Sequence, residues 1–391
     1  MANYIPDVGT SAKPAAVIYP DGKSVFLAWK GEGNDQGIYW TRTQQLAPDA
    51  AGGKYTFNPS PQLQAKDAHL NFATSHAPAL ASFQGRVYMA WKGEEGDDAI
   101  YWSYYDGANW QPQTKLQAAT KIAPAMVATG DTIFLVSKGQ SDNNIWWAMM
   151  GDSFDGGFTE LGPIKVANTI FQTSATPALT VDGNTVYMAW KGGSTDNLYW
   201  AECKQDLQSF TEGGILPVSG GLSAWGNYQW GTQQSIPAYQ GAFSGPGGAG
   251  PAVTGPALVF IKGSKGSSSG LYIAWVVIPS NSAEWGPGFS LGVSFLPQNS
   301  ATWISSGYTA EMPVVDGQPT FIPVFPPNSQ IGTVSPIYFY EGPGDDWNIY
   351  YDSIPIPIPV SSGGFTLVNS GASSGTNNES GPTSPTHGAG R

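Results

Sequence analysis

One short phrase that combines aromatic, cationic and acidic side chains recurs along the chain and could bind a ligand. In this phrase a tryptophan is followed directly by a lysine, and a tyrosine comes eight or nine positions after the lysine. An aromatic ring can stack on the apolar face of a cyclic ligand while a few placed polar groups bind its hydroxyls. Three copies supply the candidate ligand-binding residues: Trp29, Lys30 and Tyr39; Trp91, Lys92 and Tyr101; and Trp190, Lys191 and Tyr199.

The acidic member of the phrase lies between the lysine and the tyrosine. Asp35, Asp97 and Asp142 are each followed five residues later by a tryptophan, whereas Asp196 in the fourth copy precedes its tryptophan by four. A short carboxylate can accept hydrogen bonds from the backbone donors of its own turn. We therefore expect these aspartates to stabilise turns rather than to bind a ligand.

The segments around the phrase predict which elements position it. Each strong copy follows a Pro-Ala pair, a short apolar run and a tight turn such as Asp21-Gly22, which is typical of a β-hairpin. Weaker copies place Lys262 and Glu341 at the lysine position and Asp346 at the aspartate position, so that about six copies recur every ~62 residues. Four short antiparallel strands per copy predict an all-β fold, a β-propeller of about six blades. Five or seven blades are the alternatives, because the later copies are degenerate.

The aspartate turn carries a resemblance to a known family. Its best copy, Asp35-x-Gly37-x-x-Trp40, resembles the Asp-box of sialidase-like propellers, Ser-x-Asp-x-Gly-x-Thr-Trp. No copy has the threonine, and only Asp142 has a neighbouring serine, Ser141. The resemblance implies a propeller in which these boxes are hairpin staples away from the functional site. The repeated aromatic phrase also resembles the propeller lectins of fungi and bacteria, whose sugar sites lie between adjacent blades.

The charged residues exclude two classes of function. Lys and Arg number 17 against 29 Asp and Glu, a net charge of -12, and no basic run could neutralise a phosphate backbone, which excludes nucleic acid as a partner. Sialidases hold a substrate carboxylate with several arginines, and this chain has only Arg42, Arg86 and Arg391. Sialidase activity is therefore excluded, and neutral glycans are the expected partners.

The sequence offers few ligands for a metal ion. Cys203 is the only cysteine, and His69, His76 and His387 are the only histidines, so neither a disulfide within the chain nor a Cys-rich or His-rich metal centre can form. No Gly-x-Ser-x-Gly elbow leads into a helix, which argues against a Ser-His-Asp hydrolase. We expect no metal and no cofactor.

Two functions are left as alternatives. Repetition of the aromatic phrase favours a multivalent carbohydrate-binding lectin with several sites between blades over one catalytic centre. The alternative is a single-site propeller enzyme, either a glycosidase or a less usual lyase or cyclase, with a central or loop-covered pocket. A glycosidase needs only two carboxylates at the right separation. Four acids outside the phrase are its candidates: Glu160, Glu212, Glu284 and Glu311.

The chain is predicted to form one domain. Residues 1–368 are assigned to the propeller, with an insertion at 217–255 that is rich in Gly, Ser and aromatic residues and could hold a unique site. Residues 369–391 form a Gly/Ser-rich tail that we expect to be weakly ordered. Residues 1–20 show no export signal and no stretch approaches 18 apolar residues, so we expect no membrane insertion and a cytoplasmic or non-classically secreted protein.

Overall fold

Strands are the regular elements in the part of the chain that the structure describes. This computed structural model describes residues 3–42, 63–64, 72–151, 157–205, 228–236, 249–252, 254–262, 269–279, 290–309, 318–322, 337–341 and 348–353. No helix occurs within these ranges, and hence none that is long and apolar enough to cross a membrane. The all-β prediction is confirmed.

The strands form six antiparallel sheets of four or five strands, which we call blades 1 to 6. Blade 1 contains β2 (Ala15–Ile18), β3 (Val25–Lys30), β4 (Ile38–Arg42) and β5 (Leu63–Gln64), and blade 2 contains β6 (Ala79–Phe83), β7 (Arg86–Lys92), β8 (Ala99–Tyr105) and β9 (Thr114–Ala119). Blade 3 contains β10 (Ala125–Ala128), β11 (Thr132–Lys138), β12 (Ile145–Gly151) and β13 (Thr159–Pro163), and a separate pair, β14 (Lys165–Val166) and β15 (Thr169–Ile170), follows it.

Blades 4 and 5 have five strands each. Blade 4 contains β16 (Ala178–Asp182), β17 (Thr185–Lys191), β18 (Leu198–Gln205), β19 (Tyr228–Trp230) and β20 (Gln234–Ser235). Blade 5 contains β21 (Ala249–Ala252), β22 (Ala257–Ile261), β23 (Gly270–Pro279), β24 (Ser290–Pro297) and β25 (Ile304–Thr309). Blade 6 combines β26 (Thr320–Ile322), β27 (Ile337–Glu341) and β28 (Asn348–Ser353) with β1 (Asn3–Gly9).

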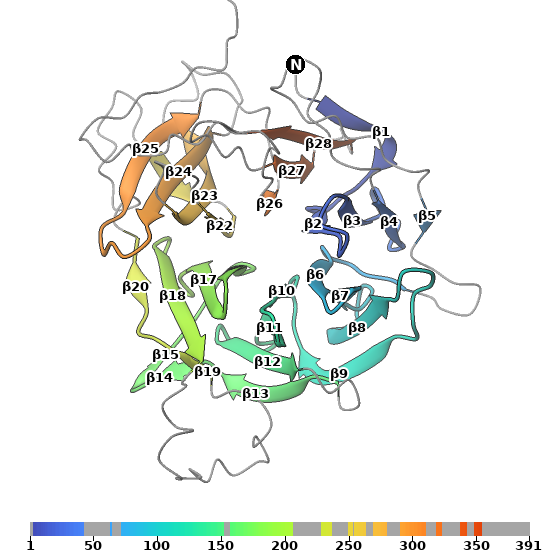
Figure 1. Cartoon of the computed structure of the whole chain (residues 1–391), viewed down its shortest axis with the longest axis horizontal. Helices are drawn as coiled ribbons and strands as arrows, with labels where there is room; N and C mark the ends of the chain where they lie inside the picture. Colours follow the sequence, from blue (N-terminus) through green and yellow to red (C-terminus); the bar gives the residue numbers. More distant parts are fainter. Residues whose placement is uncertain are drawn as a thin grey trace, which may run out of the picture.

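The six blades surround a common axis (Figure 1). The inner strand of each blade contacts the inner strand of the next, in the closed order β2, β6, β10, β16, β22, β26 and back to β2. Blade 6 closes the ring, because β1 from the start of the chain pairs with β28 as its outermost strand, with Tyr4 opposite Tyr350. Closure leaves only short outer strands with free edges. The prediction of a β-propeller with about six blades is confirmed.

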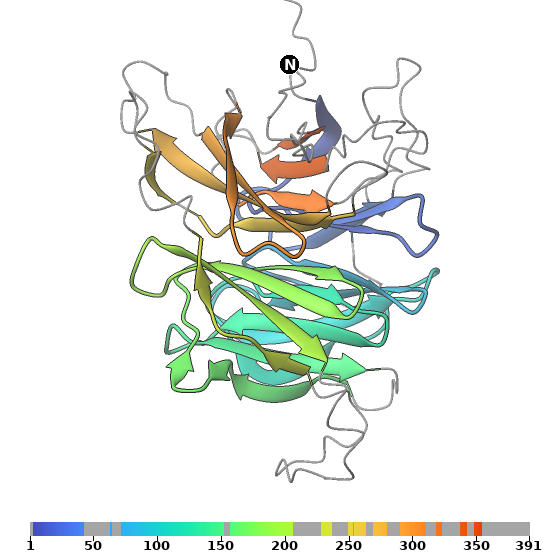
Figure 2. The same ribbon diagram turned by 60° about the vertical axis from the view of Figure 1, so that its left-hand side comes forward.

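Apolar side chains fill the space between neighbouring blades. The turned view in Figure 2 shows the sheets of blades 2 to 4 lying against one another in the lower part of the molecule. Trp91 of blade 2 packs with Ala28 and Ile38 of blade 1, and Trp190 of blade 4 packs with Val136 of blade 3. Because each sheet has this inter-blade core on both faces, its residues alternate between two apolar interfaces rather than between core and solvent.

Blade 5 corrects the predicted alignment of the fifth copy. Its inner strand β22 ends at Ile261, and Trp275 on the second strand β23 is the counterpart of Trp29, since β22 and β23 pair in the same register as β2 and β3. Lys262 therefore follows the inner strand instead of the second strand, and its Nζ lies 3.5 Å from Asp182 Oδ1 of blade 4. The assignment of Lys262 to the lysine position was wrong.

Blade 6 confirms the other weak copy. Glu341 pairs with Ile349 in the same register in which Lys30 pairs with Ile38 of blade 1. Glu341 therefore occupies the lysine position, as the sequence predicts. Asp346 lies outside the described residues.

Part of the predicted insertion at 217–255 belongs to the blades. Tyr228 lies on the outer strand of blade 4 and donates a 2.9 Å hydrogen bond to Asp131 Oδ1 of blade 3. Trp230 contacts Trp147 of blade 3 edge to face, with ring centroids 6.0 Å apart. The described part of the insertion therefore joins blades 3 and 4. The rest of it, and the tail at 369–391, lie outside the described residues.

One buried side chain near the axis connects four blades. Gln318, just before the inner strand of blade 6, accepts a 3.1 Å hydrogen bond from Lys13 Nζ of blade 1. Its Nε2 donates to the carbonyl of Pro256, which precedes the inner strand of blade 5. The same nitrogen lies 3.5 Å from the carbonyl of Thr176, which precedes the inner strand of blade 4. This amide therefore fixes the relative positions of the inner strands.

Candidate functional site

Each predicted Trp and Tyr form a cross-strand pair. Trp29 lies opposite Tyr39, Trp91 opposite Tyr101 and Trp190 opposite Tyr199, and the paired rings are stacked with centroids 6.2, 6.2 and 6.0 Å apart. All three tryptophans have 0% of their surface exposed. The indoles fill the inter-blade core, which is one of the two placements, inter-blade packing or a rim, that their position at the end of the second strand allows. The three tyrosines are half-buried and keep an accessible ring surface.

The predicted lysines hold the loop that follows the second strand. Lys30 Nζ donates to the carbonyls of Gly31 and Gly33 at 3.2 and 2.8 Å and to Ser11 Oγ at 2.6 Å. Lys30 is buried, with 6% of its surface exposed. Its ammonium is thus used within the fold, which agrees with a structural role for this lysine.

The lysines of blades 2 and 4 act in a similar way. Lys92, 3% exposed, donates to the carbonyl of Asp97 at 2.9 Å and to Ser75 Oγ at 3.0 Å. Lys191 is less buried and pairs with Asp196 Oδ1 at 2.9 Å. These contacts stabilise the loop between the second and third strands, so the lysines support the site rather than form it.

The aspartates stabilise their turns, as the sequence predicts, and they also fix the tyrosines. Asp35 accepts a 2.8 Å hydrogen bond from the Gly37 N–H through one oxygen and a 2.7 Å bond from the Tyr39 hydroxyl through the other. Asp97 likewise accepts a 3.0 Å hydrogen bond from the Ala99 N–H through one oxygen and a 2.9 Å bond from the Tyr101 hydroxyl through the other. The partner ring is therefore four residues after the aspartate, whereas the sequence drew attention to the tryptophan five residues after it.

These hydrogen bonds also set the protonation states. The bond to Asp35 raises the pKa of Tyr39 to about 12, and the bond to Asp97 raises the pKa of Tyr101. The backbone N–H of Ala99, followed by the Tyr101 hydroxyl, holds the pKa of Asp97 below its usual value. At neutral pH Tyr39 and Tyr101 are thus uncharged phenols, and Tyr101 is anchored by the ionised carboxylate of Asp97.

In four consecutive blades an aromatic ring occupies the same position of the third strand, opposite the residue that precedes the lysine. Trp146 takes the place in blade 3, with its Nε1 3.4 Å from Asp142 Oδ1, and Gly292 takes it in blade 5. We call the four rings the aromatic column: Tyr39, Tyr101, Trp146 and Tyr199. Trp146 is the most open of them, with 37% of its surface exposed.

Crossover segments between the blades complete this face of the ring, and the sequence interpretation missed them. Thr74 donates its N–H to the carbonyl of Gln36 in the blade 1 loop, at 2.8 Å. The next residue, Ser75, donates to the carbonyl of Gly93 in the blade 2 loop, at 3.1 Å. One Thr-Ser pair thereby connects two neighbouring loops. The signal was present in the sequence, since a Thr-Ser pair precedes the proline by four residues at positions 10, 74 and 173.

The residue after each aspartate reaches the next blade. Gln36 Oε1 accepts from the Glu95 N–H at 2.6 Å, Asp98 Oδ2 accepts from Gln140 Nε2 at 2.9 Å, and Asn143 Nδ2 donates to the Gly193 carbonyl at 3.1 Å. Three consecutive inter-blade contacts are built in this way. The loops therefore form a continuous polar rim that holds the aromatic column in place.

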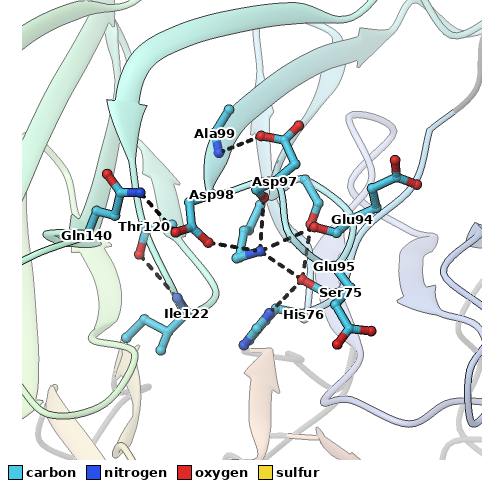
Figure 3. Close-up of polar contacts among 12 residues, drawn as sticks. Ser75, His76, Glu94, Glu95, Asp97, Asp98, Ala99, Thr120, Ile122 and Gln140 are labelled. Carbon is cyan, nitrogen blue, oxygen red and sulfur yellow. Dashed lines mark hydrogen bonds and ion pairs between the residues drawn. The ribbon is translucent and has the colours of Figure 1, made fainter.

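The polar cluster around Lys92 shows this arrangement in detail (Figure 3). Ser75 Oγ lies 3.0 Å from His76 Nδ1, and Asp98 Oδ1 lies 3.5 Å from Lys92 Nζ. Burial, followed by the charge of Lys92, lowers the pKa of His76. The contacts of Ser75 with the lysine and with a loop carbonyl recur at Ser11 of blade 1, which has no histidine beside it.

Few acids come together in the described part of the chain. Glu160 is exposed, and its Oε1 accepts a 2.8 Å hydrogen bond from the Ala118 N–H across the interface between blades 2 and 3. Glu212, Glu284 and Glu311 lie outside the described residues. Among those that the structure describes, no group of three His, Cys, Asp or Glu side chains could hold a metal ion.

Comparisons with known proteins agree on the fold. No protein-family model matches the chain, and no curated protein sequence matches it. NanB with Optactamide is similar in structure with a TM-score of 0.51 and 7% identity, over 90% of this chain and 69% of the other. The α-L-arabinanase of Penicillium chrysogenum complexed with arabinobiose has a TM-score of 0.50 and 10% identity, over 91% and 95%.

A third similar structure is a lectin. It is a variant of the Aleuria aurantia lectin in complex with alpha-methyl-L-fucoside, with a TM-score of 0.49 and 10% identity, over 94% of this chain and 96% of the other. At such identities a structural likeness bears on the fold alone. By its six radial sheets, and by its likeness in fold to the two structures with TM-scores of 0.50 and 0.51, the chain is a β-propeller.

Proposed function

We propose that the protein is a multivalent carbohydrate-binding protein, whose sites lie between neighbouring blades and use the rings of the aromatic column. One observation carries the proposal: four consecutive blades present a half-exposed aromatic ring at the same place, each on a strand that faces the preceding blade. Single exposed rings are common on a protein surface, whereas here a partly exposed ring recurs at one position of four consecutive blades.

The surroundings of each ring suit a sugar. A sugar presents an apolar C–H face, which can stack on the ring, and hydroxyls, which need polar partners at the edge of the site. Next to Tyr101 lie the carboxylate of Asp97 and the ammonium of Lys115, whose Nζ is 6.0 Å from the ring centroid. The ring therefore offers a stacking surface with a hydrogen-bond acceptor and a donor beside it.

The binding strength expected of such sites is modest. A single ring with few polar partners supports dissociation constants in the millimolar to micromolar range, about -4 to -8 kcal/mol. Several equivalent sites on one rigid ring raise the affinity for a surface that displays many copies of the sugar. With a net charge of -12, the protein is expected to prefer neutral to acidic glycans.

A glycan array followed by titration of free sugar tests the proposal. We expect binding to neutral glycans, loss of one site in Tyr101→Ala, and retention of that site in Tyr101→Phe, which keeps the ring and removes only the hydroxyl. Tyr104→Ala is the matched control, because Tyr104 is a half-buried tyrosine on the same strand but outside the aromatic column. Absence of binding to any neutral glycan at millimolar concentration would refute the proposal.

A further inference from the structure

The crossover before blade 2 contains a histidine at a position where the neighbouring crossovers have no titratable side chain. His76 follows the Thr-Ser pair of this crossover, whereas Ala12 follows the pair before blade 1 and Ala175 follows the pair before blade 4. The crossover before blade 3 has Ile122 at the same position. Among these four blades, the sequence therefore adds a proton-binding ring to blade 2 alone.

This ring shares one hydroxyl with a buried ammonium. Ser75 Oγ lies 3.0 Å from His76 Nδ1 (Figure 3), accepts a 3.0 Å hydrogen bond from Lys92 Nζ and donates to the Gly93 carbonyl at 3.1 Å. Because the hydroxyl proton is used for the carbonyl, the oxygen accepts from both nitrogens, which assigns the proton of the neutral imidazole to Nδ1. A second proton is therefore taken up at Nε2.

A proton at Nε2 would create a cation where the nearby charge is mostly positive. Among the residues that the structure describes, the charged groups that act on the ring are Lys92, Lys30 of blade 1 and Asp98. The carboxylate of Asp98 is already shared, since Oδ1 lies 3.5 Å from Lys92 Nζ and Oδ2 accepts from Gln140 of blade 3. Burial of the ring, followed by the charge of Lys92, holds the pKa of His76 below its ordinary value. Protonation of the ring therefore competes with the present position of the ammonium.

Lys92 connects this ring to the sugar site of blade 2. Its ammonium also donates to the Asp97 carbonyl at 2.9 Å, and the Asp97 carboxylate accepts from the Tyr101 hydroxyl at 2.9 Å. Both acceptors belong to one residue of the loop, so movement of the ammonium frees the turn that fixes the tyrosine. A continuous series of contacts of 2.9 and 3.0 Å thus leads from His76 to Tyr101.

Blade 1 contains the same series of contacts without a histidine. Lys30 Nζ donates to Ser11 Oγ at 2.6 Å, and Ser11 donates to the Gly31 carbonyl at 2.9 Å. Asp35 accepts from the Tyr39 hydroxyl at 2.7 Å. Blade 1 is therefore an internal control for blade 2 within one molecule.

We propose that His76 makes the sugar site of blade 2 sensitive to pH. Protonation of its ring displaces the Lys92 ammonium from Ser75 and releases the loop at 93–98. Sugar binding at Tyr101 then weakens, while the sites of blades 1 and 4 keep their affinity. This inference rests on the proposed carbohydrate binding and adds a regulation of one of its sites.

Amide hydrogen exchange tests the loop without any ligand. The Asp97 N–H donates to the Glu94 carbonyl at 2.9 Å, and the Asp35 N–H makes the same bond to Glu32 in blade 1. Exchange is compared at about pH 7.5 and at one unit below the pKa of His76, which is read from its ring resonances by NMR. At the lower pH we expect the protection factor of the Asp97 amide to fall by about tenfold or more and that of the Asp35 amide to stay constant.

His76→Ala is the matched variant, because alanine is the residue that blades 1 and 4 have at this position. It should keep the Asp97 amide protected at both pH values, although His69 and His387 still titrate in it. An Asp97 amide that stays protected at low pH in the wild type would overturn the proposal. Equal loss of protection in the wild type and in His76→Ala would overturn it as well.

Asp98→Asn tests whether charge is the cause. Asparagine keeps an acceptor for Gln140 and removes the negative charge that acts on the ring. The pKa of His76 and the pH at which the loop opens should therefore both move lower, by the same amount. A loop that opens at an unchanged pH in this variant would contradict the proposal.

Sugar titration tests the link to the site. At one unit below the pKa of His76, only about one molecule in ten keeps a neutral ring, so the affinity of one site for the best neutral glycan should fall by about tenfold. Tyr101→Ala should remove this pH-dependent part and leave the other sites. If the loop opens but every site keeps its affinity, the regulation is refuted and the proposed function stands. If the wild type binds no glycan at any pH, both are refuted.

Discussion

Replacing Lys92 by methionine measures how much a buried ammonium stabilises one loop. Methionine keeps most of the apolar stem of the side chain and removes only the charge and the donors. In the wild type, Lys92 Nζ makes two short hydrogen bonds, to the Asp97 carbonyl at 2.9 Å and to Ser75 Oγ at 3.0 Å. A bond that involves a charged group contributes about 1.5 kcal/mol or more, so the two together contribute about 3 kcal/mol.

Two smaller effects modify this value. The carbonyl of Glu94, 3.4 Å from the ammonium, and the partly exposed Asp98 carboxylate at 3.5 Å add little. Desolvation of the ammonium acts in the opposite direction. We therefore expect Lys92→Met to lower the free energy of unfolding by about 2–4 kcal/mol, measured as a shift of the urea midpoint at constant slope.

Lys138→Met is the matched control, because Lys138 has the same place in blade 3 but no hydrogen-bond partner among the residues that the structure describes. Its substitution is expected to change the free energy of unfolding by less than about 0.5 kcal/mol. Equal destabilisation by the two substitutions would show that the loop contacts of Lys92 contribute nothing beyond those of any lysine at this position.

Four further predictions concern other parts of the molecule. Asp142→Ala removes the acceptor of the Asn144 N–H at 3.0 Å and should cost about 1–3 kcal/mol of stability in a melting experiment. Burial lowers the pKa of His76, so as the pH falls below about 6.5 the unfolded chain binds a proton before the folded one does. The free energy of unfolding therefore falls in this range, and His76→Ala should flatten this part of a curve of stability against pH. Burial lowers the pKa of Lys13 from 10.5 to about 8, so Lys13→Met should stabilise the protein at pH 7 by at most about 3 kcal/mol, less the lost hydrogen bond to the Gln318 amide, and the gain should vanish above about pH 10.5. Cys203 is buried and its pKa is raised, so a thiol reagent should modify it only after unfolding, and a reductant should leave the melting temperature unchanged.

The fold could be predicted because the repeat is encoded several times over. The phrase around Trp29 recurs around Trp91 and Trp190, and each copy brings its own turn and its own apolar strands. Errors in one copy therefore do not change the class of fold. The fifth copy shows the limit: Lys262 follows an apolar strand just as Lys30 does, and only the pairing of Ala257 with Ala274 shows that the strand is the inner one.

The site was predicted less well, because residue type alone does not tell which ring faces solvent. In a propeller both faces of a sheet are buried against neighbouring blades, so Trp29 and Tyr39 carry the same apolar signal. The structure separates them: the second strand lies deep in the blade and the third lies nearer the rim. The sequence places a lysine beside each tryptophan and suggests a ligand contact, whereas a serine of the crossover, such as Ser11 for Lys30, is its partner within the fold.

The pairing of β1 with β28 has a consequence for biosynthesis. Tyr4 leaves the ribosome long before its partner Tyr350, which is 346 residues later in the chain. At roughly 5–20 residues per second, about 20–70 s pass before the two strands can meet. During this interval the nascent chain carries an early strand without its partner and five blades that cannot yet close. A holding factor that shields free strand edges would therefore be most useful to this protein before the last blade is translated, and of little use afterwards.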